Sequence, residues 1–201
     1  MNANAIRDAY VPVVVTRESD GNTTHQDLYS RLLKDRIIMI DGEIEPHMAS
    51  IVVAELLYLQ SEDAEAPIQL YISSPGGVVS AGLSIVDTMR LVSCPVHVTV
   101  HGTVASMASV IASCGEKGHR YILPNARVML HQASSGNEGN VQDMRVAMAE
   151  TERINTKIIE MLAENCGKDE VQVRKDTERD NWMDATQAVE YGVVDQVLGG
   201  R

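Results

Sequence analysis

Short runs typical of strands alternate along this chain with segments of helical spacing, and this alternation constrains the fold most. Three runs, residues 67–73, 95–100 and 127–131, place apolar side chains at every second position. Apolar residues recur at helical spacing in two other segments, residues 48–59 and 78–91. Strands that alternate with helices predict a layered α/β fold, whose ligand sites gather beyond the carboxyl ends of the strands.

The remaining segments predict one domain behind a short leader. Residues 1–26 are polar apart from residues 10–15, which predicts a mobile N-terminal leader with one strand-like element. No internal repeat or linker divides residues 27–201, so we interpret them as a single domain. Its longest predicted helix, Val141 to Cys166, either projects from the body, packs against a partner or lies across the sheet. Shorter predicted elements are a strand at 36–40, helices at 27–34, 168–179 and 184–191, and a strand-like piece at 193–197.

The charge and cysteine content narrow the possible partners. The formal net charge of −11 argues against nucleic acid and anionic membranes as partners, because both need positive charge on the protein. No apolar run has the length of a signal-peptide core or a membrane span. Cys94, Cys114 and Cys166 are odd in number and lack metal-ligand spacing, which predicts reduced thiols, no metal site and a cytoplasmic location.

One stretch, residues 98–109, places a serine where a strand changes into a helix. Its β-branched run stops at Gly102, and helical spacing starts near Ser106, so we expect a strand, a tight turn and a helix. A helix N-terminus offers unpaired N–H groups and the positive end of the helix dipole, which both stabilise an oxyanion. A simple helix-capping role explains the serine equally well. The G-x-S-x-G pattern is absent, because Val104 and Ala108 stand two residues before and two residues after Ser106, where that pattern has glycines.

Serine catalysis also needs a base, a group that orients the base and donors for the oxyanion. Two histidines, His101 and His131, stand at the ends of predicted strands and compete for the role of base. Gly76 and Gly77 precede a predicted helix, where they serve either as an ordinary turn or as an oxyanion donor. Four acidic residues compete to orient the base: Asp176, Glu178, Asp180 and Asp184.

Six blocks of the chain stand out in order: Tyr29–Leu33, Ser74–Gly77, Ala105–Met107, Leu123–Asn125 with Arg127–Gln132, Asp176–Asp180 and Ala188–Asp195. Together they resemble the family of ClpP, the proteolytic subunit of the Clp protease. The resemblance extends from about Val11 to Leu198. It implies a ClpP/crotonase-like α/β fold of repeated β-β-α units with a projecting handle helix, the handle covering about residues 132–166.

The resemblance also implies a role for each site residue. Ser106 is the implied nucleophile, His131 the general base and then acid, and Asp180 the carboxylate that orients His131. The implied oxyanion hole consists of the backbone N–H groups of Gly77 and Met107, in line with the helix-start argument. His101 then takes a structural role.

The implied assembly is a tetradecamer, a barrel of two stacked heptameric rings whose active sites face inward. A hexameric AAA+ unfoldase feeds unfolded polypeptides through an axial pore, beside which the leader forms an axial-loop segment. ATP is used by that partner, since this chain has no P-loop and needs no cofactor of its own. Glu178 and Arg179 match the inter-ring contact. The implied docking pocket for the unfoldase consists of Gln69, Tyr71, Leu91, Tyr121 and Leu198.

Two other functions stay open at this point. The family usually has a proline and a glycine pair after the His-Gln motif, whereas this chain has Ala133–Gly136, and its docking pocket holds few aromatic residues. These differences suggest a weakly active paralogous subunit that stabilises or activates a partner ring. A crotonase-type acyl-CoA enzyme shares the fold and a backbone oxyanion hole, but does not require Ser106, His131 and Asp180 together.

Overall fold

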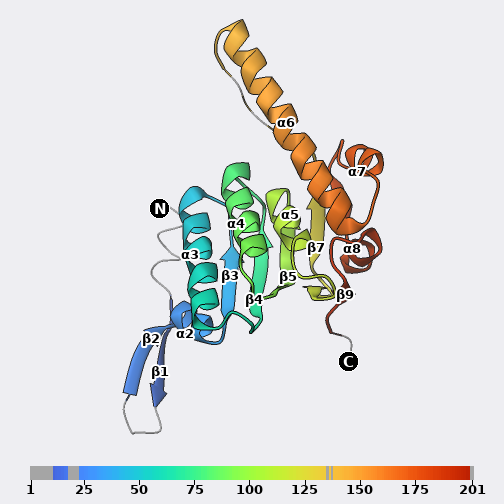
Figure 1. Ribbon diagram of the computed structural model, residues 1–201. Coiled ribbons are helices and arrows are strands. Elements are labelled where there is room, and N and C mark those ends of the chain that lie inside the picture. Colours follow the sequence, from blue (N-terminus) through green and yellow to red (C-terminus); the bar gives the residue numbers. More distant parts are fainter. Residues whose placement is uncertain (1–10, 18–22, 135, 137, 200–201) are drawn as a thin grey trace.

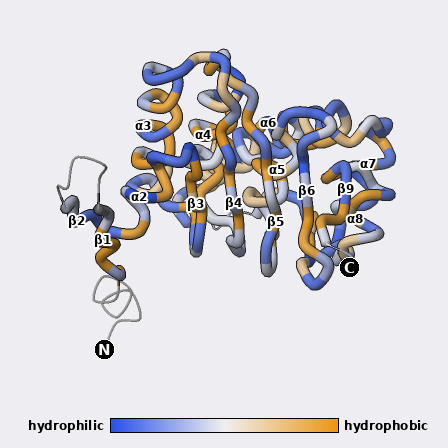
Figure 2. Tube along the Cα trace, turned by 90° about the horizontal axis from the view of Figure 1, so that it is seen from below, coloured by the Kyte–Doolittle hydropathy of each residue, from blue (hydrophilic) through white to orange (hydrophobic). Residues whose placement is uncertain are grey.

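A computed structural model describes residues 11–17, 23–134, 136 and 138–199 of the chain. Helices lie on one side of a mainly parallel sheet, and one long helix projects beyond the body (Figure 1). Seen from below, helices α3 (Pro46–Glu62) and α4 (Val79–Leu91) lie together on one side of the strands (Figure 2). The prediction of an α/β fold with a projecting helix is confirmed.

The sheet brings the carboxyl ends of its central strands to one edge. Strands β3, β4, β5, β6 and β9 pair in this order and run parallel, while β7 pairs in parallel with β5 and antiparallel with β8. Every second side chain of β4 is buried, as the alternation predicts. The strands are β3 (Ile37–Asp41), β4 (Ile68–Ser74), β5 (Val96–Ala105), β6 (Arg120–Ile122), β7 (Arg127–Leu130), β8 (Asn181–Met183) and β9 (Gln196–Val197).

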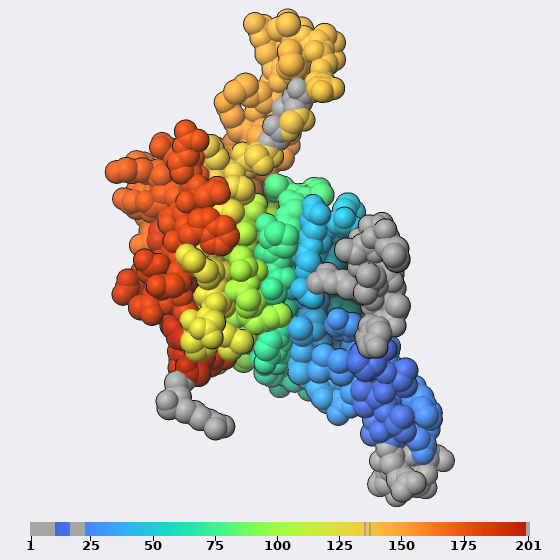
Figure 3. All heavy atoms as spheres, turned by 180° about the vertical axis from the view of Figure 1, so that it is seen from behind, coloured from blue at the N-terminus to red at the C-terminus, as the bar shows by residue number. Residues whose placement is uncertain are grey.

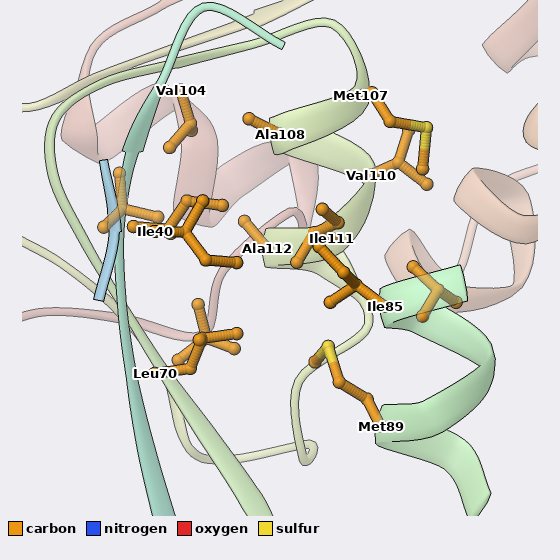
Figure 4. Packing of buried hydrophobic residues seen from close by; sticks show 14 of the residues in the cluster. Ile40, Leu70, Ile85, Met89, Val104, Met107, Ala108, Val110, Ile111 and Ala112 are labelled. Atoms are coloured by element: carbon orange, nitrogen blue, oxygen red, sulfur yellow. The ribbon is translucent and has the colours of Figure 1, made fainter. Parts of the chain in front are cut away.

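The helices cover the buried side of the sheet and enclose the core. Figure 4 shows Ile111 of the short helix α5 between Leu70 of β4 and Ile85 of α4. These three side chains are fully buried, and the core they belong to runs across the sheet. The helices are α3 (Pro46–Glu62), α4 (Val79–Leu91), α5 (Met107–Ser113), α6 (Val141–Cys166), α7 (Glu170–Asp176) and α8 (Ala185–Tyr191).

Helix α6 has the bounds that the sequence predicts. The Asn140 side chain caps its N-terminus, and Gly167 ends it in the left-handed conformation. Its buried residues lie near its C-terminal end, between Ile158 and Ala163. Val146 is 72% exposed and Met148 is 62% exposed on the projecting part. The helix therefore joins the core by its last turns, while the part that carries these exposed side chains projects beyond the body (Figure 1).

Strand β5 continues beyond Gly102, where the sequence predicts its end. Gly102 adopts φ +69°, and a Cβ there would lie 2.8 Å from the Ser73 hydroxyl oxygen, so the strand bends closely against β4 instead of stopping. Before the bend β5 pairs with β6, and after it, over Thr103–Ala105, it pairs with β7. The turn that starts the helix is therefore Ser106 itself, at the end of a longer strand.

The leader contributes an antiparallel hairpin, β1 (Val13–Arg17) with β2 (Thr23–Asp27). The predicted leader of residues 1–26 is only partly covered, because residues 1–10 and 18–22 lie outside the described residues. Asp27 caps helix α2 (Leu28–Lys34), which connects the hairpin to the sheet.

The other side of the sheet carries half-buried side chains. Its outward positions include Met39 on β3, Tyr71 on β4 and Tyr121 on β6, and each is only partly buried. Figure 3 views the molecule from this side, where strand segments lie side by side at the surface. Parallel sheets are usually covered on both faces, so this face is suited to a further layer.

Candidate active site

Ser106 occupies a strained turn between β5 and α5. Its backbone adopts φ 55° and ψ −126°, and among the described residues only Arg36 is another non-glycine residue with positive φ. Such a conformation costs about 1–3 kcal/mol and persists only where the surroundings hold it. The Ser106 N–H donates to the Met129 carbonyl oxygen at 3.0 Å, which ties the turn to β7. The result is the sharp strand-to-helix turn of a nucleophile elbow without its glycine pattern.

Two glycines let the neighbouring loop approach this turn. Gly76 has φ +94°, and a Cβ there would lie 2.7 Å from the Cβ of Ser106. Gly77 bridges to Ile44 through the Gly76 carbonyl and the Val78 amide, which leaves the Gly77 N–H outside that pairing. The approach depends on the absence of side chains at both glycines.

The candidate oxyanion donors belong to residues that line the same cavity as Ser106. These residues are Gly77 and Met107, and the Met107 N–H belongs to the first turn of α5, where amides have no partner within the helix. The Met107 side chain is buried against Gly82 of α4, which fixes the start of the helix. This arrangement can stabilise an oxyanion.

His131 and Asp180 are adjacent because β7 and β8 pair antiparallel. Leu130, the last residue of β7, pairs with Asn181, the first residue of β8. His131, which follows β7, therefore lies opposite Asp180, which precedes β8. The His131 Nδ1 atom is 3.5 Å from the Asp180 Oδ1 atom, longer than a normal hydrogen bond. The Asp180 side chain is 62% exposed, against 27% for His131. The two residues form a pair at the edge of the sheet, open to solvent on the carboxylate side.

One cavity of about 50 Å³ is lined by both Ser106 and His131. Catalytic hydrogen bonds are often loose without substrate, so a shared cavity is compatible with proton transfer between the Ser106 hydroxyl and the His131 ring. The apolar wall of the cavity consists of Val79, Val110, Leu130, Ile158 and Leu162.

The competing candidates of the sequence analysis lie elsewhere. His101 faces Tyr71 with a distance of 6.3 Å between ring centroids, and it does not line the cavity. Asp176 binds the Tyr191 hydroxyl at 3.1 Å, and Asp184 caps helix α8. The geometry therefore favours His131 and Asp180 over these alternatives.

The segment after His131 is tied to the predicted inter-ring residues. Glu178 and Arg179 are both exposed. The Gln132 side-chain amide donates to the Glu178 carbonyl at 3.2 Å, and the Ala133 N–H donates to the Asn155 side chain of α6 at 2.9 Å. A displacement at Glu178 is thus linked to the chain beside the candidate base.

The predicted docking residues are spread over several elements. Gln69 and Tyr121 lie on the outward face of β4 and β6, Leu91 is 73% exposed at the end of α4, and Leu198 follows β9. The Leu198 N–H donates to the Ile122 carbonyl at 2.8 Å. Tyr71 lies on the same face of β4 as Gln69.

Two histidines outside the predicted docking set, His97 and His119, connect Gln69 to Tyr121. His97 stacks on His119 with ring centroids 4.0 Å apart, His97 is 3.2 Å from the Gln69 amide, and His119 is 3.0 Å from the Tyr121 hydroxyl. Burial and then the charge of His119 lower the pKa of His97. The alternation along residues 95–100 puts His97 on the outward face, a signal that the sequence contains.

Among the described residues, no His, Cys, Asp or Glu side chains gather in a group able to hold a metal ion, and no helix combines the length and apolarity needed to cross a bilayer. The three cysteines are free thiols, and burial raises the pKa of Cys166 to about 11. That thiol is protonated at neutral pH and a poor nucleophile.

Comparisons with known proteins show which family this chain resembles. The model of a family described as Clp protease matches residues 19–201. The "ATP-dependent Clp protease proteolytic subunit" of Streptococcus suis (strain 98HAH33) is 46% identical over 190 residues, which cover 94% of this chain and 96% of that protein. The protein of the same name from Ligilactobacillus salivarius (strain UCC118) is 46% identical over 188 residues, covering 94% and 95%.

Proposed function

Because this chain belongs to the Clp protease family, we propose that it is the serine endopeptidase subunit of an ATP-dependent Clp protease. The proposed reaction is the hydrolysis of unfolded proteins to short peptides. The observation that carries the proposal is the single cavity lined by Ser106, His131, Gly77 and Met107. Asp180 lies beside His131 at its edge.

The proposed mechanism follows from these positions. The Ser106 hydroxyl attacks the peptide carbonyl while His131 takes its proton, and the N–H groups of Gly77 and Met107 stabilise the oxyanion. His131 then gives the proton to the leaving amine, and an acyl-enzyme remains. Water activated by His131 releases the acyl group, and Asp180 keeps the imidazole in the required tautomer.

The surface of the chain supports assembly into rings. Helix α3 exposes Ile51, Leu57 and Tyr58, which are 47%, 43% and 50% exposed, and the outward face of the sheet lacks a covering layer of helices in the described residues. We propose that neighbouring copies cover these apolar surfaces in heptameric rings. Two rings then stack through α6 and through Glu178 and Arg179.

The remaining parts of the proposal concern partners and location. A hexameric AAA+ unfoldase docks on the Gln69, Tyr71, Leu91, Tyr121 and Leu198 region and uses the ATP, so this chain itself needs no cofactor. We place the enzyme in the cytoplasm, because free thiols suit a reducing compartment.

A second candidate function is a weakly active paralogous subunit that stabilises or activates a partner ring. The distance of 3.5 Å between His131 and the exposed Asp180 favours it, because such a pair orients the imidazole only weakly. Membership in the Clp protease family leaves no support for a crotonase-type acyl-CoA enzyme.

The test compares the parent protein with Ser106→Ala. Native mass, cleavage of a fluorogenic peptide and labelling by a serine-directed fluorophosphonate are measured on the same fraction. We expect ring assembly in both proteins, with peptidase activity lower by about 10⁴-fold or more in the variant. Equal activity of the two proteins contradicts the proposal. Labelling of the parent only beside a co-expressed paralogue supports the second candidate function instead.

A further inference from the structure

Ser109, three residues after the candidate nucleophile, has a fully buried hydroxyl group, and two backbone carbonyl oxygens lie within reach of its one donor proton. Its hydroxyl oxygen is 2.6 Å from the Ser106 carbonyl oxygen and 2.9 Å from the Met129 carbonyl oxygen. Its relative exposure is 0%, so water does not replace these partners. The first contact lies within the first turn of helix α5, whereas the second reaches across to β7.

Both contacts converge on the link between the Ser106 turn and β7. The Met129 carbonyl accepts the Ser106 N–H at 3.0 Å and also lies within reach of the Ser109 hydroxyl. Met129 stands two residues before His131 on the same chain segment. Ser109 is thus a side-chain connection between the strained turn that carries the nucleophile and the strand that leads to the base.

We propose that Ser109 is a positioning residue for the peptidase reaction, holding the Ser106 turn in register with β7 and so setting the approach of the Ser106 hydroxyl to His131. This inference rests on the proposed function. The strain at Ser106 gives it a physical reason, since a residue at φ 55° relaxes unless neighbouring bonds hold it. A shift of about 1 Å between reacting groups costs roughly 10²-fold in rate.

Ser113 provides a matched control on the same helix. Its side chain is 1% exposed, its hydroxyl donates to the Val110 carbonyl at 2.7 Å, and it accepts a hydrogen bond from Asn165 of α6 at 3.1 Å. A back-bond to the preceding turn and a contact with another element are therefore common to both serines. Only Ser109, of these two, makes its second contact with the segment that carries His131.

The test measures kcat, KM, fluorophosphonate labelling and the melting temperature for the assembled parent and three variants. We expect Ser109→Ala to lower kcat and the labelling rate by about 10-fold with KM within about twofold, because substrate contacts are unchanged while alignment is lost. Ser113→Ala removes a comparable buried bond and lowers the melting temperature without this loss of kcat. Ser109→Thr retains the hydroxyl and restores at least about half of the parental kcat.

The outcomes separate this inference from the proposed function. An active parent whose Ser109→Ala variant keeps the kcat of Ser113→Ala overturns the positioning role alone. A rise of KM without a fall of kcat overturns it as well. A parent that neither cleaves the peptide nor reacts with the fluorophosphonate overturns both proposals.

Discussion

Gly76 gives the most direct test of how closely the Ser106 turn is packed. In Gly76→Ala, the new Cβ would lie 2.7 Å from the Ala105 carbonyl oxygen, 2.7 Å from the Ser106 Cβ and 3.1 Å from the Met107 nitrogen. Ordinary contacts of this kind begin near 3.4 Å, so the turn has to move by about 0.7 Å. The obstructing atoms belong to the backbone or to a Cβ, which no side-chain rotation removes.

Two costs follow from this geometry. A non-glycine residue at the φ of +94° loses about 1–2 kcal/mol, and overpacking adds about 1–3 kcal/mol. A displacement of about 0.7 Å at Ser106, the candidate nucleophile, and at the Met107 amide predicts a kcat at least about 10-fold lower. For a chain of this size, the stability loss corresponds to a melting temperature lower by about 5 °C or more.

Gly118→Ala separates the steric effect from the backbone strain. Gly118 has φ +85°, and nothing lies within 4 Å of the point that an added Cβ would occupy, so its variant carries the strain without the contact. Peptide hydrolysis and thermal unfolding are measured on assembled particles whose mass matches the parent. We expect Gly118→Ala to keep its kcat within about twofold. Equal kcat and melting temperature for the two variants would refute the packing of Gly76 against Ser106.

Two further predictions concern stability. Because burial and the neighbouring His119 charge lower the pKa of His97 below its ordinary 6.5, the unfolded chain binds that proton more strongly. This contribution to the free energy of unfolding is therefore fully present above about pH 6.5 and is lost as the pH drops below that value. Between pH 8 and about pH 5.5, the melting temperature of His97→Gln should fall less than that of the parent protein. An equal fall in the two proteins would contradict this prediction. Asp195 accepts a hydrogen bond from the Nε–H group of the buried Arg120 at 2.9 Å. Asp195→Asn leaves that charge without its partner, so it should lower the free energy of unfolding by about 3 kcal/mol and the melting temperature by about 6 °C. An unchanged melting temperature in a thermal scan would contradict this prediction.

The sequence predicts those helices and strands whose signals lie within their own residues. Helix α6 has a capping residue, Asn140, a regular apolar stripe and a terminal glycine, and all of these signals lie within its own sequence. The alternation of β4 predicts its buried face, and its span to within one residue at each end. The start of α5 directly after Ser106 likewise follows from the change there from strand-like to helical spacing of the apolar residues.

Long-range pairing determines what the sequence does not reveal. Strand β5 continues past Gly102 because β7 is available to pair with Thr103–Ala105, and the local pattern contains no sign of that partner. Strand β8 has three residues and exists only through its pairing with β7. The resemblance to ClpP singled out His131 and Asp180, whereas the antiparallel pairing gives the physical reason for their adjacency.

The members of the candidate site differ in what holds them, and this difference bears on regulation. Ser106 and the Met107 amide belong to a turn between two buried elements, and His131 follows the buried Leu130. Asp180 instead precedes a three-residue strand, is 62% exposed and directly follows Arg179. An exposed charge orients its partner weakly, because water screens the attraction. A second ring that covers this segment would exclude that water and strengthen the pairing, so assembly would act on the residue that the isolated fold holds least.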